Sequence, residues 1–176
     1  MEAGGDPRPL PVLFVDDDLR VLEAVHEALE DRFLLRTALS GDEALAVLNS
    51  EHVATPRPET WTNCKVVGNQ VFFSGMTAHN QEGVIFGAGS IYEQARHCFQ
   101  KIQHLMEAAG GQMNDIVKVN IYVTEIAKRE EVWRARREFF SGDFPCSTLV
   151  EVSALAPPGI LVEVEAVGFI GESTNA

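Results

Sequence analysis

The hydrophobic residues of this chain change their spacing several times, and this alternation between helical and strand periods limits the fold more than any other feature. From about Ile91, apolar residues recur at helical spacing until Gly110-Gly111, a pair typical of a helix C-terminus. A strand, a helix and two further strands are expected after it, over residues 117–123, 129–140, 148–152 and 161–170. This order predicts an α+β fold in which a mixed β-sheet carries two helices on one face.

A β-hairpin is expected before the long helix. Residues 64–67 and 70–75 have an alternating pattern rich in Val and Phe, and Gly68-Asn69 between them is a pair common in tight turns. The later part of the chain therefore has the order β-β-α-β-α-β-β, and we expect this domain to span residues 59–172.

The first fifty residues predict a smaller, separate segment. Pro11–Val15 is a short apolar run expected to form a strand, and the next helix carries Val21, Val25 and Leu29 on one face. A strand over 33–37 and a second helix from Ser40 through Leu48 complete a βαβα order. We expect this segment over residues 10–50, a linker over 51–58, and tails over 1–9 and 173–176.

The composition excludes several classes of protein. The formal net charge is -12, so the chain lacks the basic surface that nucleic acids require. No apolar run approaches the roughly 20 residues that cross a bilayer, and the N-terminus lacks the features of a secretory signal. The three cysteines have no CxxC spacing, which favours free thiols over a metal site. A cytoplasmic protein is expected.

Two long stretches carry a resemblance to a known family. MNDIVKVNIYVTEIAKREEVWRARREFF begins at Met113, and FPCSTLVEVSALAPPGILVEVEAVGFI begins at Phe144. Together with the preceding segments from Trp61 onward, they resemble the RidA (YjgF) family of small imine-handling proteins. The resemblance implies a chorismate-mutase-like fold, and a homotrimer with small-molecule ligands in the clefts between subunits. It also implies hydrolysis of 2-imino acids to 2-keto acids and ammonia, with no metal or organic cofactor.

The same resemblance implies a set of site residues. Ser74 and Gly75 match the family's Ser-Gly pair facing the ligand, and Trp61 stands where many members have a tyrosine. Glu163 matches the glutamate that approaches the reacting centre, and is the catalytic candidate. Each also has a structural interpretation, as a packing tryptophan, a strand end or a solvated strand residue. The remaining ligand-binding candidates follow the Phe-Pro pair: Cys146, Ser147 and Thr148.

Ser147 is the departure with the largest chemical consequence, because it occupies the position of the family's carboxylate-binding arginine. Losing one partner of a buried charged pair costs about 2–5 kcal/mol in binding. Arg57 or Lys65 could supply a compensating cation, and the sequence does not decide between them. We therefore expect deamination of 2-imino acids to be weak or of altered specificity. A non-catalytic trimeric protein that binds small ligands is the alternative.

A second resemblance concerns the first segment. VLFVDDD and ALSGDEAL resemble the opening of a response-regulator receiver domain, where Asp16 and Asp17 match acidic residues that help to hold Mg²⁺. The family's phospho-accepting aspartate, on a third strand, has no counterpart here. Asp16 and Asp17 are therefore expected to be only a vestigial magnesium site. A signalling adaptor acting through this truncated segment is the second alternative function.

Overall fold

The computed structural model describes residues 10–15, 18–29, 33–38, 45–48, 50, 52–80 and 82–171. The chain divides into two compact units, the first formed chiefly by residues 1–46 and the second by residues 47–66 and 70–176. The tails expected over 1–9 and 173–176, and the carboxylates of Asp16 and Asp17, lie outside the described residues. Within the described ranges, no helix has the length and apolar character that spanning a bilayer requires.

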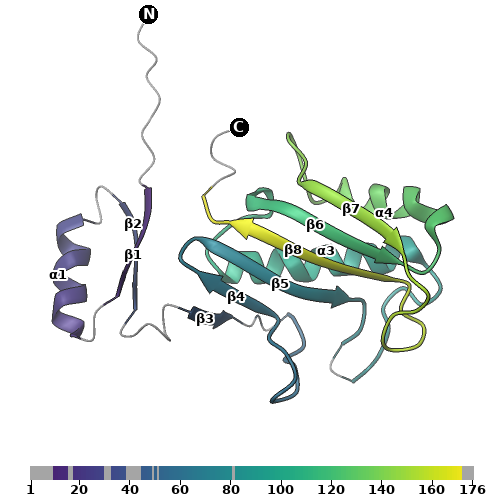
Figure 1. Ribbon diagram of the computed structural model, residues 1–176, viewed down its shortest axis with the longest axis horizontal. Helices are drawn as coiled ribbons and strands as arrows, with labels where there is room; N and C mark the ends of the chain where they lie inside the picture. The colour runs from purple at the N-terminus through teal and green to yellow at the C-terminus, as the bar shows by residue number, and fades with distance from the viewer. Residues whose placement is uncertain are drawn as a thin grey trace, which may run out of the picture. The chain divides into compact units, whose positions relative to one another are not determined.

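The first unit contains a parallel β-α-β arrangement (Figure 1). Strands β1 (Leu10–Val15) and β2 (Phe33–Ala38) pair in parallel, and α1 (Leu19–Leu29) connects them. A parallel pair needs such a crossover, because a tight turn can join only antiparallel strands. Asp18 begins the helix, since its Oδ1 accepts a hydrogen bond from the backbone N–H of Arg20 at 2.9 Å. The first three elements expected from the sequence are therefore present.

The second helix expected in this region is wrong over residues 45–48. Leu45–Leu48 forms strand β3, which lies beside β4 at the end of a six-stranded sheet. A four-residue run of Leu, Ala and Val fits either a helical turn or a strand, so its period could not decide between them. Pairing with β4 satisfies backbone groups that one isolated helical turn would leave open. Ser40 to Glu43, the expected start of that helix, lie outside the described part.

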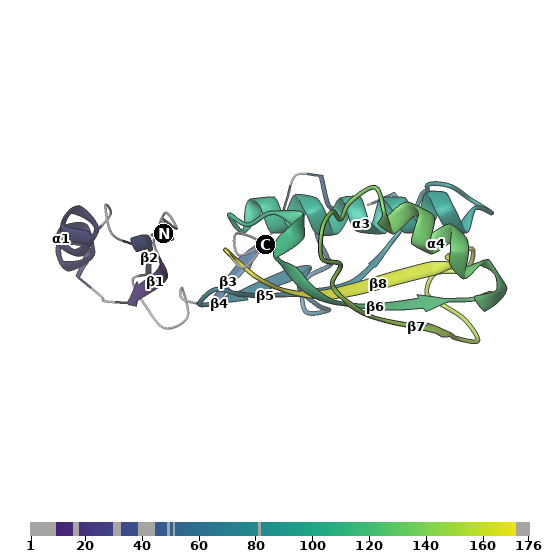
Figure 2. The same cartoon turned by 90° about the horizontal axis from the view of Figure 1, so that it is seen from above.

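The second unit is a mixed sheet with helices on one face, as expected (Figures 1 and 2). The sheet order is β3-β4-β5-β8-β6-β7, in which β8 is antiparallel to both of its neighbours and β6 is parallel to β7. Helices α3 and α4 lie on the same side of this sheet, as Figure 2 shows. The bounds are β4 Cys64–Val67, β5 Gln70–Thr77, α3 Ile91–Ala108, β6 Ile116–Val123, α4 Arg129–Arg136, β7 Cys146–Glu151 and β8 Val162–Phe169, with short 3-10 turns at Met113–Asp115 and Ile126–Lys128.

Helix α3 forms the core with the sheet, and both of its ends follow from the sequence. The Ser90 hydroxyl accepts a hydrogen bond from the Glu93 N–H at its start. At its end Gly110 has φ 83°, a left-handed conformation that glycine adopts without strain. Helix α4 ends at Arg136, earlier than the expected Phe140. The largest fully buried side chains of the core include Phe99, Ile102, Leu105, Met106, Val119, Ile121 and Val164.

The other face of the sheet carries a mixture of polar and apolar side chains. Along β8, Val162, Val164 and Ala166 are buried, whereas the alternating residues Glu163 and Glu165 are half-buried. The register places Phe72 opposite Val167, and Phe72 is 42% exposed. This face, which we call the open face, is therefore not covered by the helices of the same chain.

Candidate functional site

Glu163 and Gly75 are in close contact across strands β8 and β5. A Cβ atom built on Gly75 would lie only 1.8 Å from Glu163 Oε1, so only glycine leaves room for this carboxylate. The β5–β8 register is irregular between Phe73 and Met76, which is where Gly75 lies. A bulge of this kind allows the backbone of β5 to approach the Glu163 side chain.

The carboxylate of Glu163 is available to interact with a ligand or a water molecule. It is half-buried and forms no hydrogen bond with the part of the chain that the structure describes. Burial, and then the nearby charge of Glu165, raise the pKa of Glu163 above its usual value. A half-buried carboxyl with a raised pKa and free lone pairs is a stronger base than an exposed one and can accept and return a proton.

Glu165, two residues further on the same face, is different because its carboxylate is already engaged. Its Oε1 accepts hydrogen bonds from Asn120 Nδ2 at 2.7 Å and from the Tyr122 hydroxyl at 2.9 Å. The bond to Glu165 also raises the pKa of Tyr122. Glu165 therefore links β8 to β6, while Glu163 remains available for a ligand or a water molecule.

Ser74 has a structural task in this chain. Its hydroxyl donates to the carbonyl oxygen of Thr62 at 2.5 Å, and its backbone N–H donates to the carbonyl of Asn63 at 3.0 Å. These two bonds tie the segment that carries Trp61 to strand β5. Ser74 therefore positions Trp61, and its hydroxyl hydrogen is not available to a ligand.

A pocket of about 420 Å³ opens beside Gly75. It brings together two of the residues expected at the site, Trp61 and Gly75, and also contains Arg57. Trp61 is 53% exposed, so one surface of its ring faces solvent. The walls come from the segment before β4, the end of β5, the following loop and α3: Val53, Ala54, Thr55, Pro56, Arg57, Trp61, Asn63, Gly75, Met76, Thr77, His79, Asn80, Gly83 and Lys101.

Lys101 supplies a buried cation to this pocket. The residue is 5% exposed, and its ammonium donates to the carbonyls of Thr77 at 2.8 Å and His79 at 2.5 Å. Burial lowers the pKa of Lys101. Burial and the charge of Lys101 also lower the pKa of His79, whose Nδ1 lies 2.5 Å from the Thr77 hydroxyl oxygen. The lining of the pocket therefore contains a buried basic group.

The sequence did not single out Lys101, although a signal for it exists. It lies three residues after Cys98 and four before Leu105, both fully buried on the apolar face of α3. A lysine at that spacing interrupts the apolar stripe of a helix, and buried lysines need polar partners. Only the loop after β5 reveals which carbonyl groups those partners are.

The three candidates on β7 lie away from this pocket within one chain. Cys146 and Thr148 pair with Lys118 and Asn120 of β6, and Lys118 Nζ donates to the Thr148 hydroxyl at 2.8 Å. They therefore lie on the open face, whereas Ser147 alternates to the opposite side. Strands β8 and β6 separate β5 from β7. At a spacing of about 4.8 Å between strands, β5 and β7 are roughly 14 Å apart.

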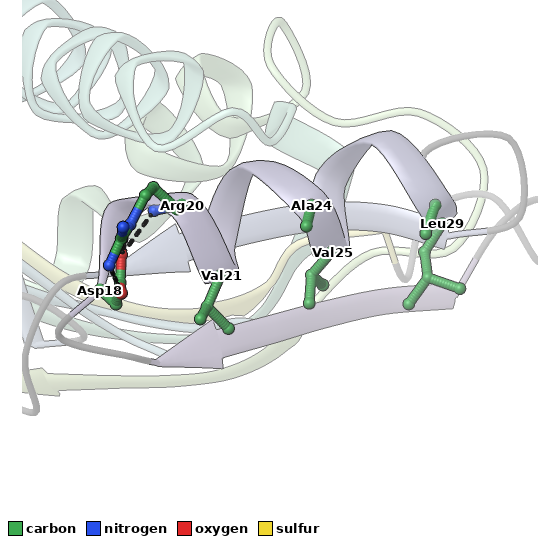
Figure 3. A pocket seen from close by; sticks show the side chains of 7 residues that line it. Asp18, Arg20, Val21, Ala24, Val25 and Leu29 are labelled. Carbon is green, nitrogen blue, oxygen red and sulfur yellow. Dashed lines mark hydrogen bonds and ion pairs between the residues drawn. The ribbon is translucent and has the colours of Figure 1, made fainter.

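A second hollow lies along α1 (Figure 3). Its lining residues all come from this helix and the residue before it, and include Val21, Val25 and Leu29. Figure 3 also shows the ion pair at its end, where Arg20 Nη2 lies 2.7 Å from Asp18 Oδ2. One helix face with a single surface ion pair offers no catalytic group. No cluster of three metal-ligating side chains occurs among the described residues.

Comparison with protein families gives one match over most of the chain. The family model described as Endoribonuclease L-PSP matches residues 54–170, which include α3, all strands from β4 to β8 and every lining residue of the pocket except Val53. Among curated proteins, a RutC family protein from Pyrococcus abyssi is 35% identical over 106 residues, 58% of this chain and 80% of that protein. A 2-iminobutanoate/2-iminopropanoate deaminase from Dermatophagoides farinae is 33% identical over 104 residues, with 59% and 80% covered.

Solved structures give the same picture. RidA from an Antarctic Psychrobacter bacterium superimposes with a TM-score of 0.63 at 28% identity, covering 71% of this chain and 99% of that one. A Pseudomonas aeruginosa protein of unknown function has a TM-score of 0.64 at 37% identity, covering 72% and 93%.

Proposed function

Because the chain belongs to the L-PSP endoribonuclease (RidA) family, we propose that it hydrolyses small imines or enamines to carbonyl compounds and ammonia. One observation carries this proposal. The half-buried carboxylate of Glu163 lies against Gly75, which lines a pocket of about 420 Å³, and it has no hydrogen-bond partner among the described residues. The 33% identity to a 2-iminobutanoate/2-iminopropanoate deaminase supports the same class of reaction.

Hydrolysis of an imine requires a positioned water molecule and a group that accepts and donates protons. Water adds to the imine carbon, which forms a C–O bond, and its proton passes to Glu163. The protonated Glu163 returns that proton to nitrogen, which gives a tetrahedral carbinolamine. Glu163 then takes the hydroxyl proton and passes it to nitrogen as the carbonyl group forms, the C–N bond breaks and ammonia leaves. The overall balance is imine plus water to carbonyl compound plus ammonia. The raised pKa of Glu163 favours both halves of this exchange.

An RNA substrate is less compatible with this chain, despite the name of the family. The net charge of -12 would repel a polyanion at every approach. A pocket of this volume lies within the usual range for small-molecule sites. We therefore take a small metabolite as the substrate.

Assembly is part of the proposal. Within one chain, strand β6 separates Glu163 on β8 from Cys146, Ser147 and Thr148 on β7, roughly 10 Å away across the sheet. A homotrimer with ligand clefts between subunits would bring them together. A serine hydroxyl cannot form the two parallel charged hydrogen bonds that an arginine forms with a carboxylate. Activity on 2-imino acids should therefore be lower than in arginine-bearing relatives.

Glu163→Gln tests the catalytic assignment. A 2-imino acid is generated in place by an amino-acid oxidase, and hydrolysis competes with trapping by semicarbazide. The substitution should lower kcat by about 100-fold or more, because proton transfer is lost. Glu165→Gln is the matched control, since an amide oxygen can still accept from Asn120 and Tyr122.

Two results would contradict the proposal. Equal kcat values for the wild type and Glu163→Gln would remove Glu163 from the reaction. No hydrolysis of any imine by the wild type would favour the alternative, a trimeric protein that only binds small ligands. Hydrolysis of 2-iminobutanoate at the rate of an arginine-bearing relative would refute the altered specificity alone.

We also propose, as an independent candidate, an adaptor role for residues 10–50, the receiver-like segment. The parallel β1-α1-β2 arrangement and the apolar α1 face at Val21 and Val25 support it. A shortened chain starting near Glu59 should then lose a signalling partner while keeping its oligomeric state and its ligand. Retention of every partner by the shortened chain would refute this role.

A further inference from the structure

We propose that the pocket beside Gly75 binds a small carboxylate, and that Arg57 is its anchoring group in place of the missing arginine at position 147. The proposal deepens the function given above and rests on it only for turnover. Binding of a carboxylate can occur whether or not the chain hydrolyses an imine. The ligand class is a short 2-oxo or 2-imino acid, with one negative charge next to a trigonal carbon.

The charge of the pocket is the first argument. Its lining contains Arg57 and Lys101, and none of the described residues that line it carries a carboxylate. The whole chain has 26 acidic and 14 basic residues, so a lining with two cations and no acid is contrary to its composition. A concave site with one sign of charge concentrates small ions of the opposite sign.

The second argument is that the side chain of Arg57 is available to a ligand. Its guanidinium forms no hydrogen bond or ion pair with the described part of the chain, and the residue is exposed at the rim of the pocket. Its backbone is nevertheless held, because Pro56 and Pro58 flank it and the Thr60 hydroxyl donates to its carbonyl at 2.5 Å. A guanidinium whose backbone is held in place and whose N–H donors are free can bind a carboxylate through two parallel hydrogen bonds.

Lys101 supplies the third argument. Its ammonium has three N–H donors, and two of them meet the carbonyls of Thr77 and His79. No other bond of this ammonium reaches a described residue, so one N–H remains for a ligand in a residue that is only 5% exposed. A buried cation without a carboxylate partner gains from an anion placed near it.

The position of the reacting group supplies the fourth argument. Trp61 and Gly75 line the same pocket as Arg57. Glu163 is not itself a lining residue, but it lies against Gly75, so the proposed catalytic group neighbours the wall of the pocket in which the acid would bind. Lys65, the other cation that the sequence allowed, is on β4 and does not line the pocket.

The test uses the full chain, 2-oxobutanoate as a stable probe, and isothermal titration calorimetry. Wild type should bind the probe, and Arg57→Gln should weaken binding at least about tenfold, as expected for lost charge-assisted bonds. Lys65→Gln removes an equal charge from an exposed strand position and should leave the affinity unchanged. The uncharged analogue 2-butanone should bind wild type and Arg57→Gln equally.

Intrinsic fluorescence provides a second measurement of the same event. The chain has two tryptophans, and Trp61 lines the pocket. The probe should change the emission of wild type, and Trp61→Phe should abolish that change. Affinity should also fall as salt rises, because the exposed Arg57 is screened.

The outcomes separate this inference from the proposed function. Arg57-dependent binding without any imine hydrolysis supports the anchor and refutes the reaction. Hydrolysis of 2-imino acids with the same KM in wild type and Arg57→Gln refutes the anchor and leaves the reaction standing. No binding of 2-oxobutanoate by wild type, or equal binding by Arg57→Gln, also overturns the inference.

Discussion

Two glutamates on one strand show how neighbouring residues of the same type acquire different roles. Glu163 and Glu165 lie on the same face of β8, but Asn120 and Tyr122 bind only Glu165. Glu163 instead faces Gly75, where the absence of a side chain leaves room for its carboxylate. The difference arises from the neighbours on β5 and β6, because the two positions are equivalent in the strand period.

Gly75→Ala should therefore impair catalysis more than folding. The new methyl group would meet the flexible end of Glu163, which can rotate away, so the free energy of unfolding should change by about 1 kcal/mol or less. The displaced carboxylate should lower kcat by about 100-fold, as in Glu163→Gln. The measurement is kcat for imine hydrolysis together with urea unfolding.

Gly168→Ala is the matched control on β8. A Cβ there would meet Met106 Cε at 2.4 Å and the Asp115 carbonyl at 3.0 Å, which are core atoms. This variant should lose stability while its folded fraction keeps its kcat. If Gly75→Ala retained full kcat, the contact with Glu163 would have no catalytic meaning.

At the scale of elements, α3 serves both the core and the pocket. Gln94 is fully buried, and it donates to the Gly159 carbonyl at 3.0 Å and accepts from the Leu161 N–H at 2.7 Å. One turn later the helix presents His97, which stacks on Phe86 at 4.4 Å, and then Lys101. The helix therefore fixes the strand β8 at one point and the pocket loop at another.

His97 should make stability depend on pH. Burial first, and then the charge of Lys101, lower the pKa of His97 from 6.5 to about 4. Between these values the unfolded chain binds a proton that the folded chain does not. The contribution of His97 is therefore fully present above pH 6.5, and it is lost as the pH falls towards 4.

Urea unfolding across this pH range tests that sign. His97→Gln should flatten the loss of unfolding free energy between pH 6.5 and 4, because glutamine does not titrate. Identical slopes for His97→Gln and wild type would show that His97 titrates normally in the folded protein.

At the scale of the whole molecule, we propose the open face of the sheet as the contact between subunits. Phe72 and Val150 are each 42% exposed on this face, and α3 and α4 both cover the opposite one. Exposed apolar side chains on a sheet face are stabilised when another subunit buries them. The proposed trimer would bury it and would also bring β7 of one subunit to the site of the next.

Phe72→Lys should disrupt that assembly. Light scattering after size-exclusion chromatography should give three times the mass of one chain for wild type and a lower mass for Phe72→Lys. Leu19→Lys, at a position 55% exposed on α1 of the first unit, should keep the wild-type mass. A monomeric wild type would refute the trimer, and with it the meeting of Ser147 and Glu163 across subunits.

The sequence by itself determined the order of elements in the second unit. Helix α3 ends at a Gly-Gly pair, and β8 alternates over eight residues, so each period is long enough to be decided locally. Leu45–Leu48 is too short for its hydrophobic period to distinguish a helix from a strand, and pairing with β4 decided that it is a strand. The sequence also pointed to Glu163, Gly75 and Trp61, through its resemblance to the RidA family.

The tertiary structure alone decided which cation shares the pocket. Arg57 and Lys65 were equal candidates in the sequence, and only the packing of residues 53–63 beside Gly75 brings Arg57 into the lining. The tertiary structure also decided the partners of Lys101, since the carbonyl groups that it binds lie more than twenty residues earlier in the chain. Local periodicity encodes which way a side chain points, whereas the partners it meets depend on contacts between distant segments.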